Sequence, residues 1–303
     1  MSVTFFKIKR WYRMLIGNSV WHVEQNVGKY FSSSELNGYY NDLTNKVIMM
    51  PDLLTNDNLP QLNLENNTYV DFPVAIFQYG LGAYDLYFQT NDIRYKNKCL
   101  QCAEWALKNM DSEGRWNNFF YVFPDNPYGA MAQGEGVSLM LRAYKLTNIT
   151  AYFDASKKAI DYMLRSVEEG GNTDYNNGET IFLECTHLSA ILNGWIFAWW
   201  GLYDYVLLTN DMGIYKLRLN ESLNSLLNHL PKFSCIYWSY YDLNYKIASP
   251  FYHDLHVAQM QAMYELTGIE LFSSYARRWE KQKRNIIYKS FAFMKKVYQK
   301  IKE

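Results

Sequence analysis

Residues 128–147 read YGAMAQGEGVSLMLRAYKLT, a helical pattern that ends in an aromatic residue, a leucine and a threonine. Related endings recur three times: AYDLYFQT ends at Thr90, YDYVLLT at Thr209 and MYELT at Thr267. The four threonines follow one another at intervals of 57, 62 and 58 residues. A near-constant period of this kind indicates a repeat architecture.

A second amphipathic helix is expected after each ending, around 93–109, 150–166, 213–229 and 270–285. Each repeat is then a helical hairpin, and stacked hairpins bury their apolar faces against one another. Long loops between the hairpins, such as 110–130, favour a closed ring over an open solenoid. The sequence therefore predicts an all-α fold, an (α/α) toroid or barrel whose inner helices converge on a cleft.

The part of the chain before the first repeat has a different character. Residues 1–50 are expected to be helical and irregular, and to end in a polar turn at 37–42. Residues 51–70 are rich in Asn, Asp, Leu and Pro, which predicts a short arm or β-hairpin. We divide the chain into an N-terminal helical arm and hairpin, residues 1–70, and an (α/α)-barrel domain, residues 71–303.

Composition limits the possible partners. The 303 residues contain 30 basic and 30 acidic side chains, so the basic surplus of a nucleic-acid-binding protein is missing. An anionic partner would be held by local cations. The CxxC at 99–102 lies in a helical pattern without a second pair, which favours a core helix over a metal or redox site.

The N-terminal stretch FFKIKRWYRMLIG, residues 5–17, is basic and amphipathic. It lacks the apolar core and cleavage site of a signal peptide, and no stretch has the length of a membrane span. We expect a cytoplasmic protein, with peripheral membrane contact through this helix and a homodimer as further expectations.

The densest cluster of chemically versatile side chains lies at 236–259, IYWSYYDLNYKIASPFYHDLHVAQ. Tyrosine can serve as acid or base, histidine as its partner, and aromatic rings as platforms for a sugar. The alternative is that tyrosine is simply abundant, with 27 in the chain.

Polar residues and glycines recur near the start of each inner helix, ten to twenty residues before its threonine. Gly allows close approach of the backbone to a ligand, and helix N-termini attract anions. Ordinary helix starts also favour such residues. We expect a sugar subsite formed by Tyr79, Gln133, Glu135, His187, Asn193 and His253.

The absence of several known catalytic motifs excludes some enzyme classes. The chain has no GxSxG, HExxH, P-loop or GxGxxG motif. No distinctive pair of facing carboxylates supports a glycoside hydrolase. Removal of the proton next to a uronate carboxylate fits the tyrosines better, because two tyrosines on opposite sides of a ring can act as base and acid.

At this point the residues resemble a known family, the D-glucuronyl C-5 epimerases. Any one of the shared phrases is weak, but their order over about residues 70–285 is specific. GYYNDLT, residues 38–44, resembles the arm that precedes the catalytic domain in bacterial members. The phrases are FPVAIFQYGLGAY (72–84), YGAMAQGEGVSLMLRAY (128–144), LSAILNGWIFAWWGLYDY (188–205), YYDL (240–243), YHDLHVAQMQAM (252–263) and ARRW (276–279).

The resemblance implies an (α/α) barrel that inverts C-5 of D-glucuronate to L-iduronate within a heparosan-like polysaccharide, without a redox cofactor. The family's catalytic tyrosines fall on Tyr241 and Tyr252, and a family glutamate falls on Glu184. Animal members carry an arginine after Tyr-Asp-Leu, where this chain has Asn244. Lys246, an imidazole or another arginine would then hold the substrate carboxylate.

Three other functions remain open from the sequence. A uronate polysaccharide lyase begins with the same proton abstraction and then cuts the chain. A glycoside hydrolase would depend on two carboxylates, and a non-catalytic toroid would only bind glycans. A metal at His253 and His256 lacks a third ligand, so hydrogen bonding is expected there.

Overall fold

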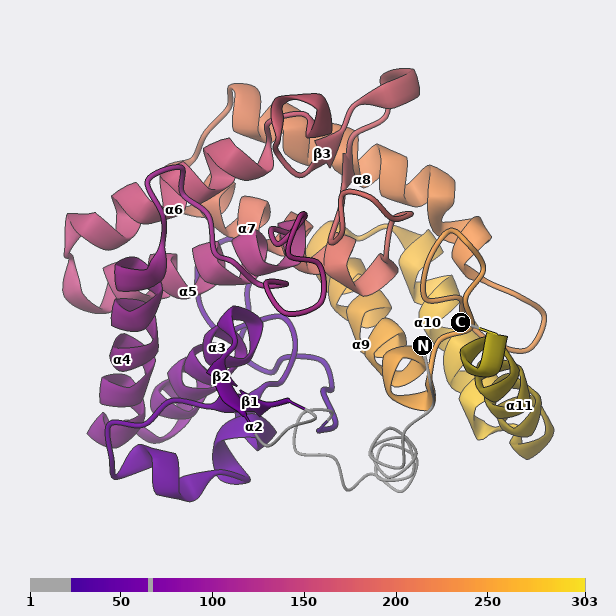
Figure 1. The fold of residues 1–303 in the computed structure, drawn as a ribbon, viewed down its shortest axis with the longest axis horizontal. Helices are drawn as coiled ribbons and strands as arrows, with labels where there is room; N and C mark the ends of the chain where they lie inside the picture. Colours follow the sequence, from indigo (N-terminus) through magenta and orange to yellow (C-terminus); the bar gives the residue numbers. More distant parts are fainter. Residues whose placement is uncertain (1–22, 65–67, 303) are drawn as a thin grey trace.

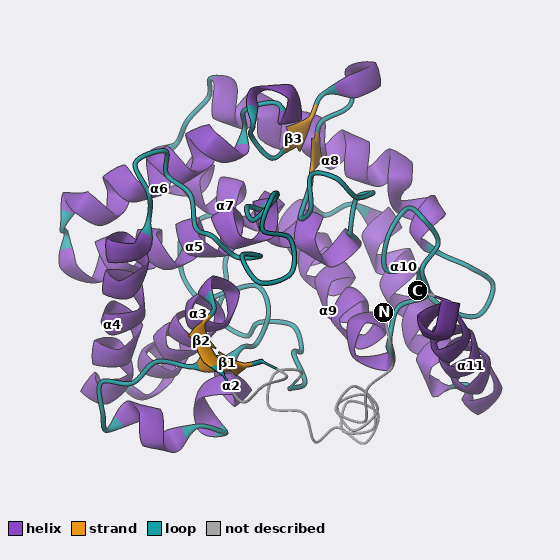
Figure 2. Cartoon of the chain, viewed as in Figure 1, coloured by secondary structure: helices purple, strands orange, loops and turns teal. Residues whose placement is uncertain are grey.

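The computed structural model describes residues 23–64 and 68–302 (Figure 1). Within these ranges helices joined by loops make up most of the chain, and the only strands are two small antiparallel pairs (Figure 2). The predicted basic helix at 5–17 lies outside the described residues. Among the described residues, no helix is long and apolar enough to cross a membrane.

Four helical hairpins form the body of the protein, as the repeat predicts. Each inner helix ends at the threonine named above, and each outer helix begins three or five residues later. Inner helices are buried on most of their surface, whereas outer helices are amphipathic. The pairs are α3 (Pro73–Thr90) with α4 (Ile93–Asn109), α5 (Ala130–Thr147) with α6 (Thr150–Met163), α7 (Leu192–Thr209) with α8 (Ile214–His229), and α9 (Pro250–Thr267) with α10 (Glu270–Arg284).

The repeated threonine marks where each inner helix stops. Its hydroxyl donates to the carbonyl four residues earlier, as Thr90 does to Leu86 at 2.7 Å. The next residue is left-handed: Asn91 has φ 55°, and Asn148, Asn210 and Gly268 repeat that conformation. Asparagine and glycine tolerate this backbone, which ends a helix by satisfying its last carbonyls. The recurring phrase is therefore a helix-termination signal.

The hairpins follow one another around a curved wall (Figure 1). Along it α3 packs on α5, α5 on α7, and α7 on α9, so these four helices form the inner layer of an all-α toroid. Helices α5 and α7 approach most closely at two glycines. A Cβ on Gly201 would lie 2.4 Å from the Gly134 backbone, so these glycines serve helix packing, not ligand approach.

The chain before α3 fills the interior of the inner layer. Tyr39 and Tyr40 are fully buried, and α2 (Thr44–Ile48) packs on α3. Arg142 of α5 donates to the carbonyls of Asn37 and Gly38, at 3.0 and 2.9 Å. The expected polar turn at 37–42 is therefore a buried plug, because its backbone polar groups find partners on the inner helices.

The remaining elements are short connections and a terminal helix. A 3-10 turn η1 (Pro51–Leu54) leads to strands β1 (Gln61–Asn63) and β2 (Tyr69–Asp71), which confirm the predicted hairpin. The domain boundary at residue 70 stays a prediction. The other elements are η2 (Val167–Glu169), β3 (Thr173–Asp174), η3 (Asn176–Gly178), β4 (Ile181–Phe182), η4 (Leu230–Phe233) and α11 (Ile286–Lys302).

Candidate active site

Tyr241 lies in the loop between η4 and α9, and this loop is tied to the start of α7. The carbonyl of Tyr241 accepts from the Leu192 amide at 3.1 Å, and the Leu243 amide donates to Ala190 at 3.1 Å. Asp242 Oδ1 accepts from the Lys246 amide at 3.0 Å, which closes the following turn. The aspartate of the Tyr-Asp-Leu phrase therefore has a structural role, and it fixes the tyrosine beside α7.

Tyr252 lies in the first turn of α9 and contacts Tyr241. The two ring centroids are 4.8 Å apart at an interplanar angle of 58°. Ser249 caps this helix by accepting from the Tyr252 amide, and Pro250 occupies the first helical position. The two predicted catalytic tyrosines thus meet although they come from a loop and a helix.

Glu184 brings a carboxyl group to the same place. It follows β4, and a Cβ on Gly194 of α7 would lie only 2.3 Å from Glu184 Oε2, so glycine makes room for this carboxyl. Glu184 Oε2 is buried without a hydrogen-bond partner. Burial raises the pKa of Glu184 to about 7. Burial, reinforced by the charge of Glu184, raises the pKa of Tyr241 well above its ordinary value.

A second carboxyl group, that of Glu135 on α5, interacts electrostatically with Glu184. Glu135 Oε1 accepts from Gln78 Nε2 of α3 at 2.7 Å, and Oε2 is buried without a hydrogen-bond partner. Burial raises the pKa of Glu135 to about 8, opposed by Gln78 and by the charge of Lys46 on α2. Lys46 is buried too, and burial lowers its pKa to about 8.

Amide groups of α7 and α9 extend this polar region. The backbone carbonyl of Asn193 accepts from Gln259 Nε2 at 3.3 Å. The side-chain oxygens of both residues are buried without a hydrogen-bond partner. Buried polar atoms in native proteins usually have partners, so several such oxygens together distinguish this region from an ordinary core.

The position of the family arginine carries no cation here. Asn244 is exposed at the turn after Tyr241. A cation comes instead from α11, where Lys296 Nζ lies 5.6 Å from the centroid of the Tyr241 ring. Lys296 also donates to the Ile247 carbonyl at 2.8 Å, which holds its side chain across the loop.

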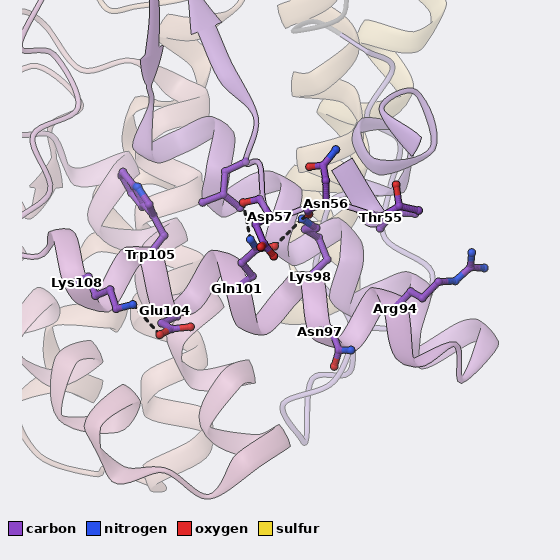
Figure 3. A pocket seen from close by; sticks show the side chains of 12 residues that line it. Thr55, Asn56, Asp57, Arg94, Asn97, Lys98, Gln101, Glu104, Trp105 and Lys108 are labelled. Carbon is purple, nitrogen blue, oxygen red and sulfur yellow. Dashed lines mark hydrogen bonds and ion pairs between the residues drawn. The ribbon is translucent and has the colours of Figure 1, made fainter. Parts of the chain in front are cut away.

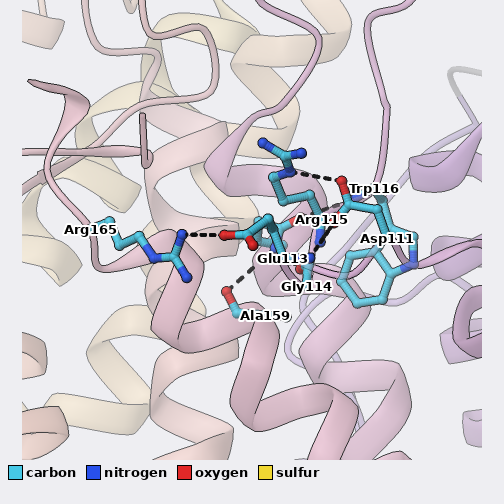
Figure 4. Close-up of polar contacts among 8 residues, drawn as sticks. Asp111, Glu113, Gly114, Arg115, Trp116, Ala159 and Arg165 are labelled. Carbon is cyan, nitrogen blue, oxygen red and sulfur yellow. Dashed lines mark hydrogen bonds and ion pairs between the residues drawn. The ribbon is translucent and has the colours of Figure 1, made fainter. Parts of the chain in front are cut away.

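Three residues predicted for the sugar subsite have structural roles. Gln133 Nε2 donates to the Gly114 carbonyl at 2.7 Å, and Gln133 Oε1 accepts from the Trp116 amide at 3.2 Å. Figure 4 shows Gly114 and Trp116 beside Ala159, whose carbonyl also accepts from Gln133 Nε2, at 3.4 Å. Two residues along a helix are rotated by about 200°, so Gln133 and Glu135 cannot share a face. Gln133 therefore holds the loop before α5 rather than a ligand.

The side chains of Tyr79 and His253 also form hydrogen bonds to backbone carbonyls. The Tyr79 hydroxyl donates to the Met50 carbonyl at 3.2 Å, and its neighbour Gln78 faces the polar region instead. His253 is buried, stacks on Trp238 at 3.6 Å and has an Nε2 that is 3.0 Å from the Trp279 carbonyl. Burial lowers its pKa to about 3, so this imidazole is neutral.

Of the remaining predicted residues, His187 lies at the surface, whereas Glu135 and Asn193 lie in the polar region. His187 is exposed and packs edge-on against Phe123, with the ring centroids 4.6 Å apart. Ser239 Oγ lies 2.8 and 2.9 Å from Nδ1 of His253 and His256, so both imidazoles are hydrogen-bonded as expected. The structure brings together Tyr241, Tyr252, Glu184, Glu135 and Asn193.

A separate cavity of about 630 Å³ lies on the outer face of α4 (Figure 3). Lys98 Nζ in its wall donates to the carbonyls of Asn56 and Asn58, and Gln101 donates to the Asp57 carbonyl at 2.6 Å. These polar groups attach the loop before β1 to α4. The cavity is remote in the fold from the tyrosines on α9 and its preceding loop.

Gln78, Lys46, Gln259 and Lys296 belong to the polar region but were missed by sequence reasoning. Gln78 is adjacent to the predicted Tyr79, and its contact with Glu135 joins two different helices, so no pattern within one helix marks it. Lys46 and Lys296 come from outside the repeats, and no local pattern marks them.

The chain is also similar to known proteins. Residues 110–281 match the family model of the D-glucuronyl C5-epimerase C-terminus. A D-glucuronyl C5-epimerase of Caenorhabditis elegans is 26% identical over 205 residues, which cover 58% of this chain and 33% of that protein. An uncharacterised protein of Methanocaldococcus jannaschii is 28% identical over 207 residues, 61% of this chain and 67% of the relative.

Among solved structures, a polysaccharide lyase matches 80% of this chain and 35% of its own, with a TM-score of 0.42 and 13% identity. That likeness is too remote to bear on function. The family model, in contrast, matches more than half of the chain and includes Glu184, Tyr241 and Tyr252. The protein therefore belongs to the family of the D-glucuronyl C5-epimerase C-terminus.

Proposed function

We propose that this protein inverts C-5 of D-glucuronate residues within a heparosan-like polysaccharide, giving L-iduronate. The observation that carries the proposal is the contact of Tyr241 with Tyr252 beside the buried carboxyl of Glu184, in a chain of the C5-epimerase family. The C. elegans relative spans about three times the matched length, so the activity of the whole relative is transferred here only as a hypothesis.

Tyr241 is assigned the role of acid. Its raised pKa keeps the phenol protonated, which a proton donor requires. Tyr252, on the other side of the contact, is assigned the role of base. In the forward direction the Tyr252 phenolate removes the C-5 proton and becomes a neutral phenol, while the Tyr241 phenol delivers a proton to the opposite face of the same carbon and becomes a phenolate. Exchange with solvent then returns Tyr252 to the phenolate and Tyr241 to the phenol.

The substrate carboxylate must be neutralised while C-5 gives up its proton, because charge then develops on the carboxylate oxygens. Lys296 is the cation we assign to this task in place of the family arginine. Its position over Tyr241 would also stabilise the phenolate that forms when Tyr241 donates. Glu184, with a pKa near neutrality, would carry a hydrogen bond to the sugar or to Tyr241.

The decisive experiment incubates the purified protein with heparosan in heavy water. Deuterium at C-5 in an intact chain, together with new iduronate, is the expected result by NMR and mass spectrometry. Chain cleavage with an unsaturated, ultraviolet-absorbing end would identify a lyase instead. Binding without exchange on N-sulfated and unsulfated heparosan would contradict the proposal and favour a glycan-binding toroid.

Two substitutions separate the roles of the tyrosines. Tyr241→Phe should abolish iduronate formation yet still allow deuterium exchange into glucuronate, because Tyr252 can remove a proton and return a deuteron to the same face. Tyr252→Phe should lose exchange on glucuronate, by about 10²–10⁴-fold for removal of a general base. Tyr245→Phe is the matched control, since Tyr245 is exposed in the same loop and should change neither rate.

A further inference from the structure

The terminal helix α11 packs with its polar side inward. Lys296 donates to the Ile247 carbonyl, and Gln299 accepts from the Ile247 amide at 2.9 Å and donates to the Tyr245 carbonyl at 3.2 Å. Ala292 on the same side is buried. This inner side combines hydrogen bonds to the loop that carries Tyr241 with the packing of Ala292 in a small apolar cluster with Trp238 and Ile247.

The opposite side of α11 is apolar and faces solvent. Ile287, Phe291, Met294 and Tyr298 are 60%, 54%, 57% and 56% exposed. Their spacing of four, three and four residues puts them on one face of the helix, which we call the apolar stripe. A helix normally turns its apolar face to the core. A reversed orientation leaves an apolar surface that marks an interaction site.

Positive charge is concentrated in the same part of the chain. Residues 270–303 contain ten Lys and Arg against three Asp and Glu, whereas residues 1–269 contain 20 and 27. On α11, Lys302 Nζ lies 4.6 Å from the Tyr298 ring and borders the apolar stripe, whereas Lys289 is about 200° from Ile287 and lies on the opposite side. An apolar face with a lysine at its edge, in a segment of positive charge, is the pattern of a helix that lies in a membrane interface.

We propose that the outer face of α11 docks on an anionic lipid membrane, with the apolar stripe in the headgroup region and Lys302 on the lipid headgroups. Charge complementarity favours this occupant over a second copy, because two such faces would each bring the same positive charge. A hydrated polyanion would pair with the lysines but would leave the apolar stripe in water. This inference is independent of the proposed catalytic function.

The test is co-sedimentation of the full chain with vesicles of phosphatidylcholine alone and of equal parts phosphatidylcholine and phosphatidylglycerol. We expect binding to the anionic vesicles that weakens with salt. The variant Ile287→Ser, Phe291→Ser, Met294→Ser should bind the anionic vesicles at least about 100-fold more weakly, because three apolar side chains that would be buried in the lipid are lost. Lys302→Gln should weaken binding by about fivefold, whereas Lys289→Gln, on the opposite side of α11, should weaken it less.

The matched control is Met212→Ser, Ile214→Ser, Leu217→Ser, which removes three exposed apolar residues at the start of α8. It should bind as the parent does, and circular dichroism should show the same helix content in all variants. Equal binding by the α11 variant would overturn the proposal. So would heparin binding with no vesicle binding, or a dimer in gel filtration that only the α11 variant dissociates.

Discussion

The same two helices, α5 and α7, carry a buried polar cluster at each end, and the two clusters differ in whether a carboxylate forms an ion pair with a cation. Towards the C-terminal ends, Arg142 and Asp204 form a fully buried ion pair at 2.6 Å, and Tyr40 donates to Asp204. Towards the N-terminal ends, Glu135 and Glu184 each have a buried oxygen without a hydrogen-bond partner.

Pairing decides what each cluster can do. The Arg142 guanidinium donates to Asp204, to the Ser138 carbonyl and to the carbonyls of the plug. Its charge therefore stabilises the fold. In the Glu135 cluster burial raises the pKa of both carboxyls, because the available partners do not compensate desolvation. Raised carboxyl pKa values in a region of unsatisfied oxygens are typical of a functional site.

Arg142→Ala should give the largest effect. Removal of one partner leaves Asp204 charged and buried, which should lower the free energy of unfolding by about 3–5 kcal/mol. Chemical denaturation measures the change. Lys157→Ala, which breaks the exposed pair with Asp161, is the control and should cost less than about 1 kcal/mol. A similar small loss for Arg142→Ala would mean that the cluster does not hold the plug.

Glu135→Gln should raise the free energy of unfolding, whereas Arg142→Ala lowers it. The folded pKa of Glu135, about 8, lies above its ordinary 4.5. Between these values the folded state keeps a proton that the unfolded state releases, so the parent loses stability as pH rises through this window. The variant lacks that loss and should be more stable at pH 8, on the order of 2 kcal/mol, but similar at pH 4.5. Destabilisation at pH 8 would show that Glu135 is ionised and well paired.

Lys296→Met tests the cation at the tyrosine end of the unpaired cluster. Turnover on heparosan should fall about tenfold, less than the loss of a fully buried charge-stabilising donor, because Lys296 is only half-buried. Lys296→Arg should restore part of the rate. Lys289→Met, on the same helix but away from Tyr241, should leave turnover unchanged; equal losses for both lysines would remove Lys296 from the site.

Gln78→Met should give the smallest effect. It removes the hydrogen bond to Glu135 Oε1 and should cost about 1 kcal/mol of stability. The pKa of Glu135 should rise further, since Gln78 opposes the effect of burial. Carbon-13 NMR of the Glu135 carboxyl would follow its titration, and an unchanged pKa would show that this bond does not stabilise the ionised form.

The repeats could be predicted from the sequence because local signals define them. Each inner helix ends at Thr90, Thr147, Thr209 or Thr267, where a hydroxyl and a left-handed residue stop the helix within one turn. The convergence of Tyr241, Tyr252 and Glu184 was likewise anticipated, although through family phrases rather than through local physics.

Helical rotation and long-range placement explain where the sequence could not locate the polar region. A step of one residue turns a side chain by about 100°, so Gln78 reaches Glu135 whereas the predicted Tyr79 bonds the Met50 carbonyl. His253, one residue after Tyr252, likewise stacks on Trp238. The plug at 37–42 could not be located, since its partners Arg142 and Asp204 are more than a hundred residues away.

Helix α11 has two sides with different tasks, Lys296 over Tyr241 on one and the apolar stripe on the other. The two tasks are then thermodynamically linked, because a membrane that holds α11 in place also holds Lys296 over Tyr241. The effect is reciprocal: a polysaccharide that engages Lys296 should tighten attachment to lipid by the same factor that lipid tightens capture of the polysaccharide. The protein would then favour glycan chains at a membrane over identical chains in solution.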